Sequence, residues 1–102
     1  MTPISTIHSA AEKIRAGYDP EKIILFGSHA RNTARKSSDV DLLIIKQTKD
    51  RYFDRVKKVR RFVGPGLPAD ILVYTPEELE KAKNSFFMQE ILEEGKILYE
   101  KR

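Results

Sequence analysis

The chain has 102 residues, of which 40% are hydrophobic and 33% charged, with no cysteine and a formal net charge of +4. This composition is that of a globular domain, and it excludes disulfides and thiolate metal sites. No apolar run is close in length to a membrane-spanning helix, which needs about 20 residues, and we see no signal peptide at the N-terminus. We therefore expect a single cytoplasmic domain over residues 1–102 that makes no contact with a membrane.

Helices and strands alternate in the first half of the chain. Apolar residues spaced three and four apart predict a helix over Thr2–Ala16, which Gly17 would end. The apolar runs Lys22–Phe26 and Asp39–Lys46 predict strands, and a short helix over His29–Arg35 is expected between them.

The second half continues this alternation. A helix is expected over Asp50–Val63, with an apolar stripe of Tyr52, Phe53, Val56, Val59 and Val63. The remaining predicted elements are a strand over Ala69–Thr75, a helix from Pro76 with Thr75 and Glu78 as its capping box, a helix over Ser85–Glu94 that Gly95 stops, and a short strand over Lys96–Tyr99. This alternation, without an internal repeat or a linker, predicts an α/β fold.

Three aspartates suggest a chemical function. Asp39 and Asp41 are two residues apart on one predicted strand, so their side chains share a face. Asp70 starts another predicted strand, and the three carboxylates meet at one edge of the sheet if these strands are neighbours. Each aspartate could instead serve a turn or a strand start, but a charged Asp41 between Val40 and Leu42 is costly to bury without a partner.

Carboxylates gathered in this way repel one another, because two unit charges about 4 Å apart cost about 4 kcal/mol at an effective dielectric near 20. Without a cation, at least one carboxylate would keep its proton. Magnesium removes this conflict and prefers carboxylates combined with substrate phosphates, and a pair of such ions can assist an in-line displacement at phosphorus. The pattern therefore predicts a site for Mg²⁺, with two ions.

A Gly27-Ser28 pair ends the first predicted strand. Glycine lets the backbone approach a phosphate closely, N–H groups at a helix start favour anions, and the Ser28 hydroxyl is a further donor. Arg31, Arg35 and Lys36 follow closely enough in sequence to meet a triphosphate. Gly-Ser alone is a common turn, but together with two aspartates at a fixed distance it predicts a nucleotide-binding site.

These motifs have a counterpart in a known family. The segment LFGSHARNTARKSSDVDLLI is similar to the signature of the DNA polymerase β-like nucleotidyltransferases, in which ten residues separate Gly-Ser from Asp-x-Asp. The segment PADILVYT resembles the strand that carries their third carboxylate, so the match spans residues 20–75. The length and the EEGKILYE segment resemble the minimal nucleotidyltransferases, which include the MntA-type antitoxins often encoded beside a HEPN-domain toxin.

The resemblance implies a mixed sheet flanked by helices, with ATP as the substrate. It further implies that Asp39 and Asp41 bind magnesium, that Asp70 completes the metal site or acts as the base, and that Ser28 holds phosphate.

Two other positions depart from the family pattern or vary within it. Many relatives have glycine where this chain has Asn32, and asparagine tolerates a left-handed backbone better than most residues. The position of His29 varies among such proteins, and we expect a surface residue there.

Two functions from different classes agree with the sequence. The first is transfer of AMP from ATP to a hydroxyl group of a partner protein, with a HEPN-type toxin as the expected partner. The second is a non-catalytic module that masks such a toxin by contact alone. Transfer to a small molecule is a third alternative, which the missing helical acceptor domain of larger relatives disfavours, whereas the three carboxylates favour catalysis.

Two further segments bear on binding partners. The basic residues of Arg51–Arg61 are expected to form the solvated face of a helix, so we do not expect nucleic acid to bind. The segment Ser85–Glu94 has more apolar residues than a terminal helix needs for the core. The excess, among Phe86, Phe87, Met88, Ile91 and Leu92, would serve a partner protein or a homo-oligomer.

Overall fold

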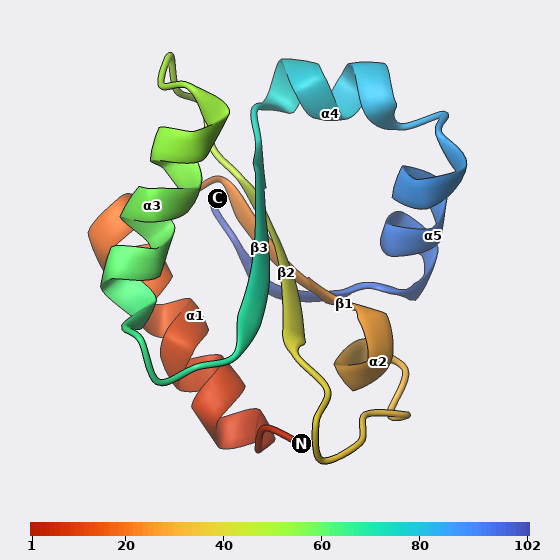
Figure 1. Ribbon diagram of the computed structural model, residues 1–102. Coiled ribbons are helices and arrows are strands. Elements are labelled where there is room, and N and C mark those ends of the chain that lie inside the picture. Colours follow the sequence, from red (N-terminus) through yellow and green to blue (C-terminus); the bar gives the residue numbers. More distant parts are fainter.

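A computed structural model describes residues 1–102 and shows an α/β arrangement of five helices and a four-stranded sheet (Figure 1). The elements in chain order are α1 (Ile4–Tyr18), β1 (Lys22–Phe26), α2 (Gly27–Ala30), β2 (Val40–Ile45), α3 (Tyr52–Val63), β3 (Ala69–Tyr74), α4 (Pro76–Ala82), α5 (Phe86–Glu94) and β4 (Lys96–Glu100). None of the helices combines the length and the apolar composition that crossing a membrane requires.

The sheet is mixed, with the strand order β3-β2-β1-β4. Strands β2 and β3 are parallel, and α3 makes the crossover between them, as parallel neighbours require. Strand β1 is antiparallel to both β2 and β4. Helices α1 and α3 cover one face of the sheet, whereas α4 and α5 lie on the other side (Figure 1).

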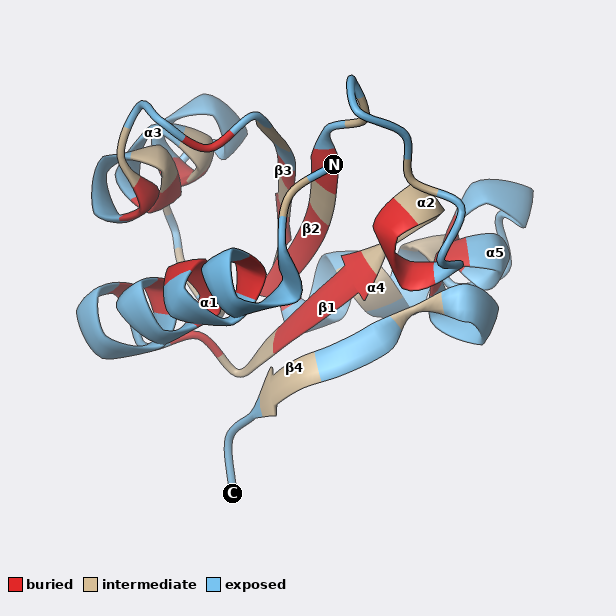
Figure 2. Cartoon of the chain, turned by 90° about the horizontal axis from the view of Figure 1, so that it is seen from below, coloured by how far each residue is buried: buried red, intermediate tan, exposed pale blue.

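Alternation along β2 divides the core between these two faces. Val40, Leu42 and Ile44 pack in the larger cluster beneath α1 and α3, and Leu43 and Ile45 pack in a smaller cluster with residues of α5. The buried side of α1 faces the sheet, and β4 lies at the more exposed edge (Figure 2). The predicted alternation, in which residues two apart on this strand share a face, is therefore confirmed, and it places the odd-numbered residues of β2 on the α5 side.

The end of α1 differs from the prediction. The helix continues past Gly17 to Tyr18 and ends at Asp19, whose φ of 53° is left-handed. Gly17 instead allows α3 to approach, because a Cβ there would overlap the ring of Phe62. Helix spacing alone did not reveal this contact, since it depends on a second helix.

The predictions for α2 and α3 also need correction. The short helix covers Gly27–Ala30 rather than His29–Arg35. In α3 the predicted apolar stripe is only partly correct, because Val59 is buried but Phe53 is 70% exposed. Arg55 takes a buried place on that helix, where its guanidinium makes hydrogen bonds that no apolar side chain could make.

The other predicted elements agree with the structure to within two residues at each end. Strand β1 has the predicted bounds, and Thr75 and Glu78 form the predicted capping box of α4. Ser85 caps α5, and β4 follows directly after Gly95.

Candidate active site

Asp41 and Asp70 lie side by side on the parallel strands β2 and β3, where they are register partners. On its other side, Asp41 pairs with Phe26 at the end of β1. Since Leu43 and Ile45 pack toward α5, Asp41 lies on the same face by alternation. The condition set by the sequence, that the two aspartate-bearing strands are neighbours, is therefore met.

Asp39 precedes β2 by one residue, and it is exposed. Its backbone carbonyl accepts a hydrogen bond from Nδ1 of His29, with 3.1 Å between the two atoms. Its negative charge acts on Asp41, as described next, so the pair belongs to one electrostatic site.

The pKa of the Asp41 carboxyl is raised above its ordinary value. Partial burial is the largest cause, followed by the negative charges of Asp70 and Asp39. A hydrogen bond with Asp70 further stabilises the protonated form, while the electrostatic effect of His29 acts in the opposite direction. The repulsion by Asp70 and Asp39, which adds to the effect of burial, is the conflict that the sequence predicted for carboxylates gathered without a cation.

Gly27 lies directly beneath the Asp41 side chain. Its φ of 73° is left-handed, and a Cβ at this position would overlap Oδ2 of Asp41. Glycine is thus required at residue 27 for two reasons, the left-handed backbone of the turn from β1 into α2 and the close approach of the Asp41 carboxylate. Ser28 follows at the start of α2, half-buried, where the first N–H groups of the helix have no intrahelical acceptor.

Two hollows adjoin these residues and share the walls formed by Phe26 and Phe87. One is lined by Asp41 and Asp70 together with Ile71 and Leu72. The other, about 150 Å³, lies between α2 and α5 and includes Gly27, Arg31, Glu90, Ile91 and Glu94 in its lining. The two phenylalanine rings meet edge to face, with 6.3 Å between their centroids.

The basic residues expected at the triphosphate lie in different surroundings. Arg31 lines the hollow beside Gly27, where its Nη1 pairs with Oε2 of Glu94 at 3.1 Å. Arg35 and Lys36 are exposed on the loop before β2 and line neither of the two hollows. The structure therefore brings only Arg31 next to the Gly27–Ser28 turn.

The expectation for Asn32 agrees with the structure, whereas the expectation for His29 does not. Asn32 has a φ of 60°, so asparagine does occupy a left-handed position here, as expected. The expectation of a surface histidine is wrong, because His29 is only 9% exposed. A helix start at Gly27 instead of His29 would have placed this side chain in the first turn, next to the buried Ala30.

The donor set fits a divalent cation of the oxygen-preferring kind. No three histidine, aspartate or glutamate side chains form a ready set of ligands. Mg²⁺, however, is usually held by one or two carboxylates with water and substrate phosphates completing its shell. Asp41 and Asp70, with Asp39 nearby, offer such an incomplete oxygen site, and a cation there would offset the burial of the Asp41 carboxylate and its repulsion by Asp70 and Asp39, the causes that raise the pKa of Asp41.

Comparisons with known proteins agree with this geometry. Residues 9–102 match the family model described as "Polymerase beta, Nucleotidyltransferase". Two proteins of Methanocaldococcus jannaschii are similar in sequence. "Putative protein adenylyltransferase MJ0604" is 36% identical over 80 residues, which cover 78% of each chain. "Putative protein adenylyltransferase MJ1305" is 37% identical over 95 residues, 87% of this chain but only 65% of that relative's length.

Two solved structures share the fold. A structure described as "a putative nucleotidyltransferase from Sulfolobus solfataricus" has a TM-score of 0.68 and 21% identity, covering 95% of this chain and 79% of that one. A structure described as "the toxin-antitoxin with AMP-PNP" has a TM-score of 0.64 and 18% identity, covering 93% of this chain and 74% of that one. At these identities the likeness concerns the fold alone.

Proposed function

This chain belongs to the polymerase β nucleotidyltransferase family, and from that membership we propose that it transfers AMP from ATP to a hydroxyl group of a partner protein. The observation that carries the proposal is the register pair Asp41 and Asp70, which faces a hollow and has Gly27 directly beneath it. The two similar Methanocaldococcus proteins bear the name of protein adenylyltransferases, which supports a protein as the acceptor.

The transfer is a displacement at the α-phosphorus of ATP. A hydroxyl oxygen of the partner forms the new bond to phosphorus, and the bond between the α-phosphorus and its bridging oxygen breaks, so that pyrophosphate leaves. Asp70, exposed at the edge strand β3, takes the hydroxyl proton or contributes to the metal site. The partner therefore approaches from the β3 side, next to Phe87 of α5.

Asp39 and Asp41, with Asp70, would hold magnesium, two ions by analogy with other enzymes that displace groups at phosphorus. Bound there, the metal neutralises charge on the triphosphate and lowers the pKa of the attacking hydroxyl. Asp41 is the central carboxylate of the three, since the negative charges of both Asp70 and Asp39 act on it.

The triphosphate would lie along the Gly27–Ser28 turn, where backbone N–H groups and the Ser28 hydroxyl donate hydrogen bonds. Arg31 is the basic side chain within reach, although it must leave Glu94 to bind phosphate. Ser28→Ala should weaken ATP binding by about 1–2 kcal/mol, because a hydrogen bond to a charged group is lost.

The partner we propose is a HEPN-type toxin, for which a toxin–antitoxin neighbour in the same fold is a supporting observation. Helix α5 offers a surface for it, because Phe87, which lines the carboxylate hollow, is 53% exposed and its neighbour Phe86 is 84% exposed. The same helix carries Glu90, Glu93 and Glu94 and no basic residue, so it suits a basic partner surface.

The test is incubation with labelled ATP, magnesium and the product of a neighbouring toxin gene, followed by mass spectrometry of the toxin. We expect the toxin to gain the mass of one or more AMP units, and Asp39→Asn and Asp41→Asn to abolish the gain. If the toxin is neutralised without added mass, and the two variants neutralise it equally well, the protein is instead a masking module.

A further inference from the structure

The imidazole of His29 joins two segments that are far apart in the chain. Its Nε2 accepts a hydrogen bond from the backbone N–H of Thr2 at 3.2 Å, and its Nδ1 lies 3.1 Å from the backbone oxygen of Asp39. A carbonyl oxygen can only accept, so Nδ1 carries the ring proton and Nε2 does not. The ring is thus fully used as one donor and one acceptor, and it is only 9% exposed.

Asp39 has few other restraints. It is exposed and lies between the loop residue Ser38 and Val40, the first residue of β2. The hydrogen bonds between the strands begin at Val40, whose N–H donates to the backbone carbonyl of Pro68 in the segment before β3. The only side-chain bond to the Asp39 backbone comes from His29, which is itself fixed in α2 one residue after Ser28.

We propose that His29 is a positioning residue for Asp39, which it holds by the Asp39 carbonyl while the Thr2 N–H fixes the plane of the ring. This links the nucleotide-binding turn of α2 to the end of β2 that carries Asp39, and makes the N-terminal segment a support of the site. The inference rests on the proposed function, because it takes Asp39 to be a metal ligand. Partners of this kind fix the orientation of ligands and typically change metal affinity by about 10- to 100-fold when removed.

A purely structural role is the competing explanation, since a buried ring also fills space between α2 and the N-terminal segment. Two substitutions of different side-chain length can each keep one of the two hydrogen bonds of His29 and remove the other. In His29→Asn the amide nitrogen replaces Nδ1 and can still donate to Asp39, but the side chain is too short to reach Thr2. In His29→Gln the amide oxygen replaces Nε2 and can accept from Thr2, whereas the donor to Asp39 is lost.

The experiment measures Mn²⁺ binding by electron paramagnetic resonance, in the presence of a non-hydrolysable ATP analogue, for the wild type and the variants. We expect His29→Ala and His29→Gln to weaken Mn²⁺ binding about tenfold or more, and His29→Asn to stay within about threefold of the wild type. In the metal-free protein, ¹⁵N NMR should show a protonated Nδ1 and an unprotonated Nε2 for His29.

Val59→Ala is the matched stability control, because Val59 is a fully buried residue of α3 in the core cluster on the face of the sheet away from Asp41. It should lower the melting temperature without changing Mn²⁺ binding. Equal Mn²⁺ affinity in the wild type, His29→Ala and His29→Gln would overturn the positioning role of His29 but leave the proposed function standing. An equal loss in all three His29 variants would reduce that role to space filling. A wild type that binds no Mn²⁺ would overturn the metal site, and with it both the proposed function and this inference.

Discussion

Gly27 and Asp41 occupy the same small space, so two motifs that are separate in sequence depend on each other in structure. A side chain at residue 27 must displace the Asp41 carboxylate and also adopt a left-handed φ. The Gly-Ser turn is therefore needed for the carboxylate position as well as for phosphate binding.

We expect Gly27→Ala to destabilise the fold by about 1–3 kcal/mol, the cost of a strained left-handed residue, and to abolish Mn²⁺ binding. Urea unfolding and Mn²⁺ titration measure the two effects. Gly66→Ala is the control, because a Cβ there meets nothing within 4 Å and its φ is not left-handed. Wild-type Mn²⁺ affinity in Gly27→Ala would contradict the contact with Asp41.

Asp41 should be a source of instability when no cation is present. Because its folded-state pKa is raised, the protein is most stable with Asp41 protonated, and stability is lost as pH rises from the ordinary value of 3.8 through the folded-state pKa. At neutral pH without divalent cations, Asp41→Asn should therefore melt at or above the temperature of the wild type.

Magnesium with nucleotide should reverse this order, by raising the melting temperature of the wild type more than that of Asp41→Asn. Differential scanning fluorimetry with and without EDTA, at pH 4 and pH 7, makes the comparison. The metal assignment fails if both proteins shift equally on addition of magnesium and nucleotide.

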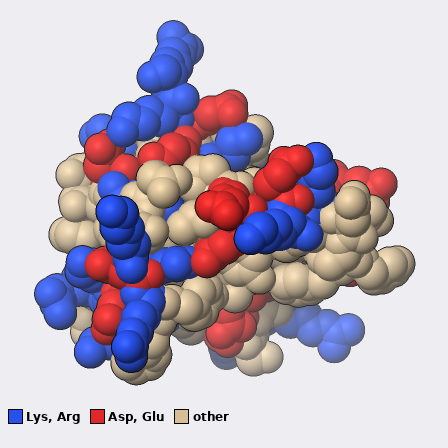
Figure 3. Space-filling view, turned by 90° about the horizontal axis from the view of Figure 1, so that it is seen from above, with Lys and Arg blue, Asp and Glu red and all other residues tan.

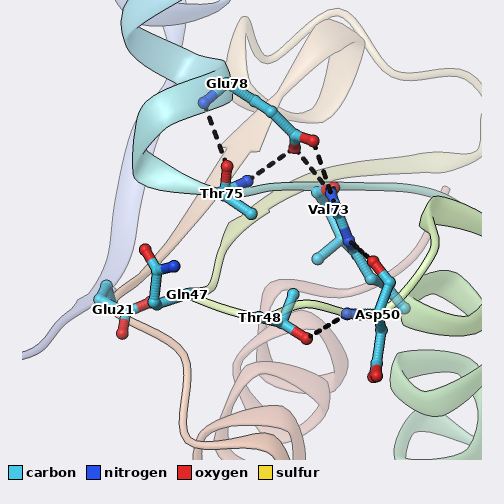
Figure 4. Close-up of polar contacts among 8 residues, drawn as sticks. Glu21, Gln47, Thr48, Asp50, Val73, Thr75 and Glu78 are labelled. Carbon is cyan, nitrogen blue, oxygen red and sulfur yellow. Dashed lines mark hydrogen bonds and ion pairs between the residues drawn. The ribbon is translucent and has the colours of Figure 1, made fainter.

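At the scale of elements, Arg55 ties α3 to β3 and α4. Its Nη1 donates to the Val73 carbonyl at 3.2 Å and to Oε1 of Glu78 at 2.7 Å, and its Nε donates to the Asp50 carbonyl at 2.9 Å. Glu78 also exchanges hydrogen bonds with Thr75 in the capping box (Figure 4). Because β3 carries Asp70 at its other end, this network fixes the strand on which the third carboxylate lies.

Glu78→Gln should destabilise the fold by about 1–2 kcal/mol at pH 7, with the lower value favoured because the Glu78 side chain is 46% exposed. The pKa of Glu78 is lowered, first by the Arg55 hydrogen bond, so its stabilisation is present above the ordinary value of 4.5 and is lost as pH falls through the folded-state pKa. Urea unfolding at pH 7 and pH 3 should show a difference only at pH 7. A difference of the same size at both pH values would count against the ion pair.

Apart from the bounds of α2, the sequence predicted the elements and the shared face of Asp39 and Asp41 because these depend on local spacing. The position of Asp70 beside Asp41 depended in addition on the strand order. Alternation along Val40–Ile45 determined which face each residue occupies, and the Thr75 capping box was visible in four consecutive residues. Three contacts could not be predicted, namely Gly17 against Phe62, Arg55 with Glu78, and His29 with Thr2. Each joins residues that only the packed fold brings together, and single-sequence spacing contains no information about them.

At the scale of the whole molecule, charge is distributed without a continuous basic surface on the face that Figure 3 shows. Basic and acidic side chains are interspersed there. Ion pairs such as Lys58 with Asp50 and Lys81 with Glu77 neutralise part of the positive charge of the protein. The exposed aromatic residues of α5, of which Phe87 lines the carboxylate hollow, form the surface that we propose for contact with the partner protein.

Phe86→Ser should raise the KM for the partner protein about tenfold, which corresponds to about 1.4 kcal/mol, and leave the KM for ATP unchanged. Phe53→Ser is the matched control, because Phe53 is also a largely exposed phenylalanine but lies on α3, across the sheet from α5. Steady-state transfer kinetics with each variant distinguish the two surfaces. Equal effects of the two substitutions would show that α5 is not the docking surface.

The central strand β1 is completed only by residues that are translated much later, because its second neighbour is β4 (Lys96–Glu100). While the ribosome extends the chain, β1 can pair with β2 but leaves its other edge unpaired, and Ile23, Ile24 and Leu25 lie along that edge. An apolar edge of this kind is a template for aggregation. The solubility of the nascent protein therefore depends on how soon residues 96–100 emerge to cover the strand that leads into the Gly27 turn.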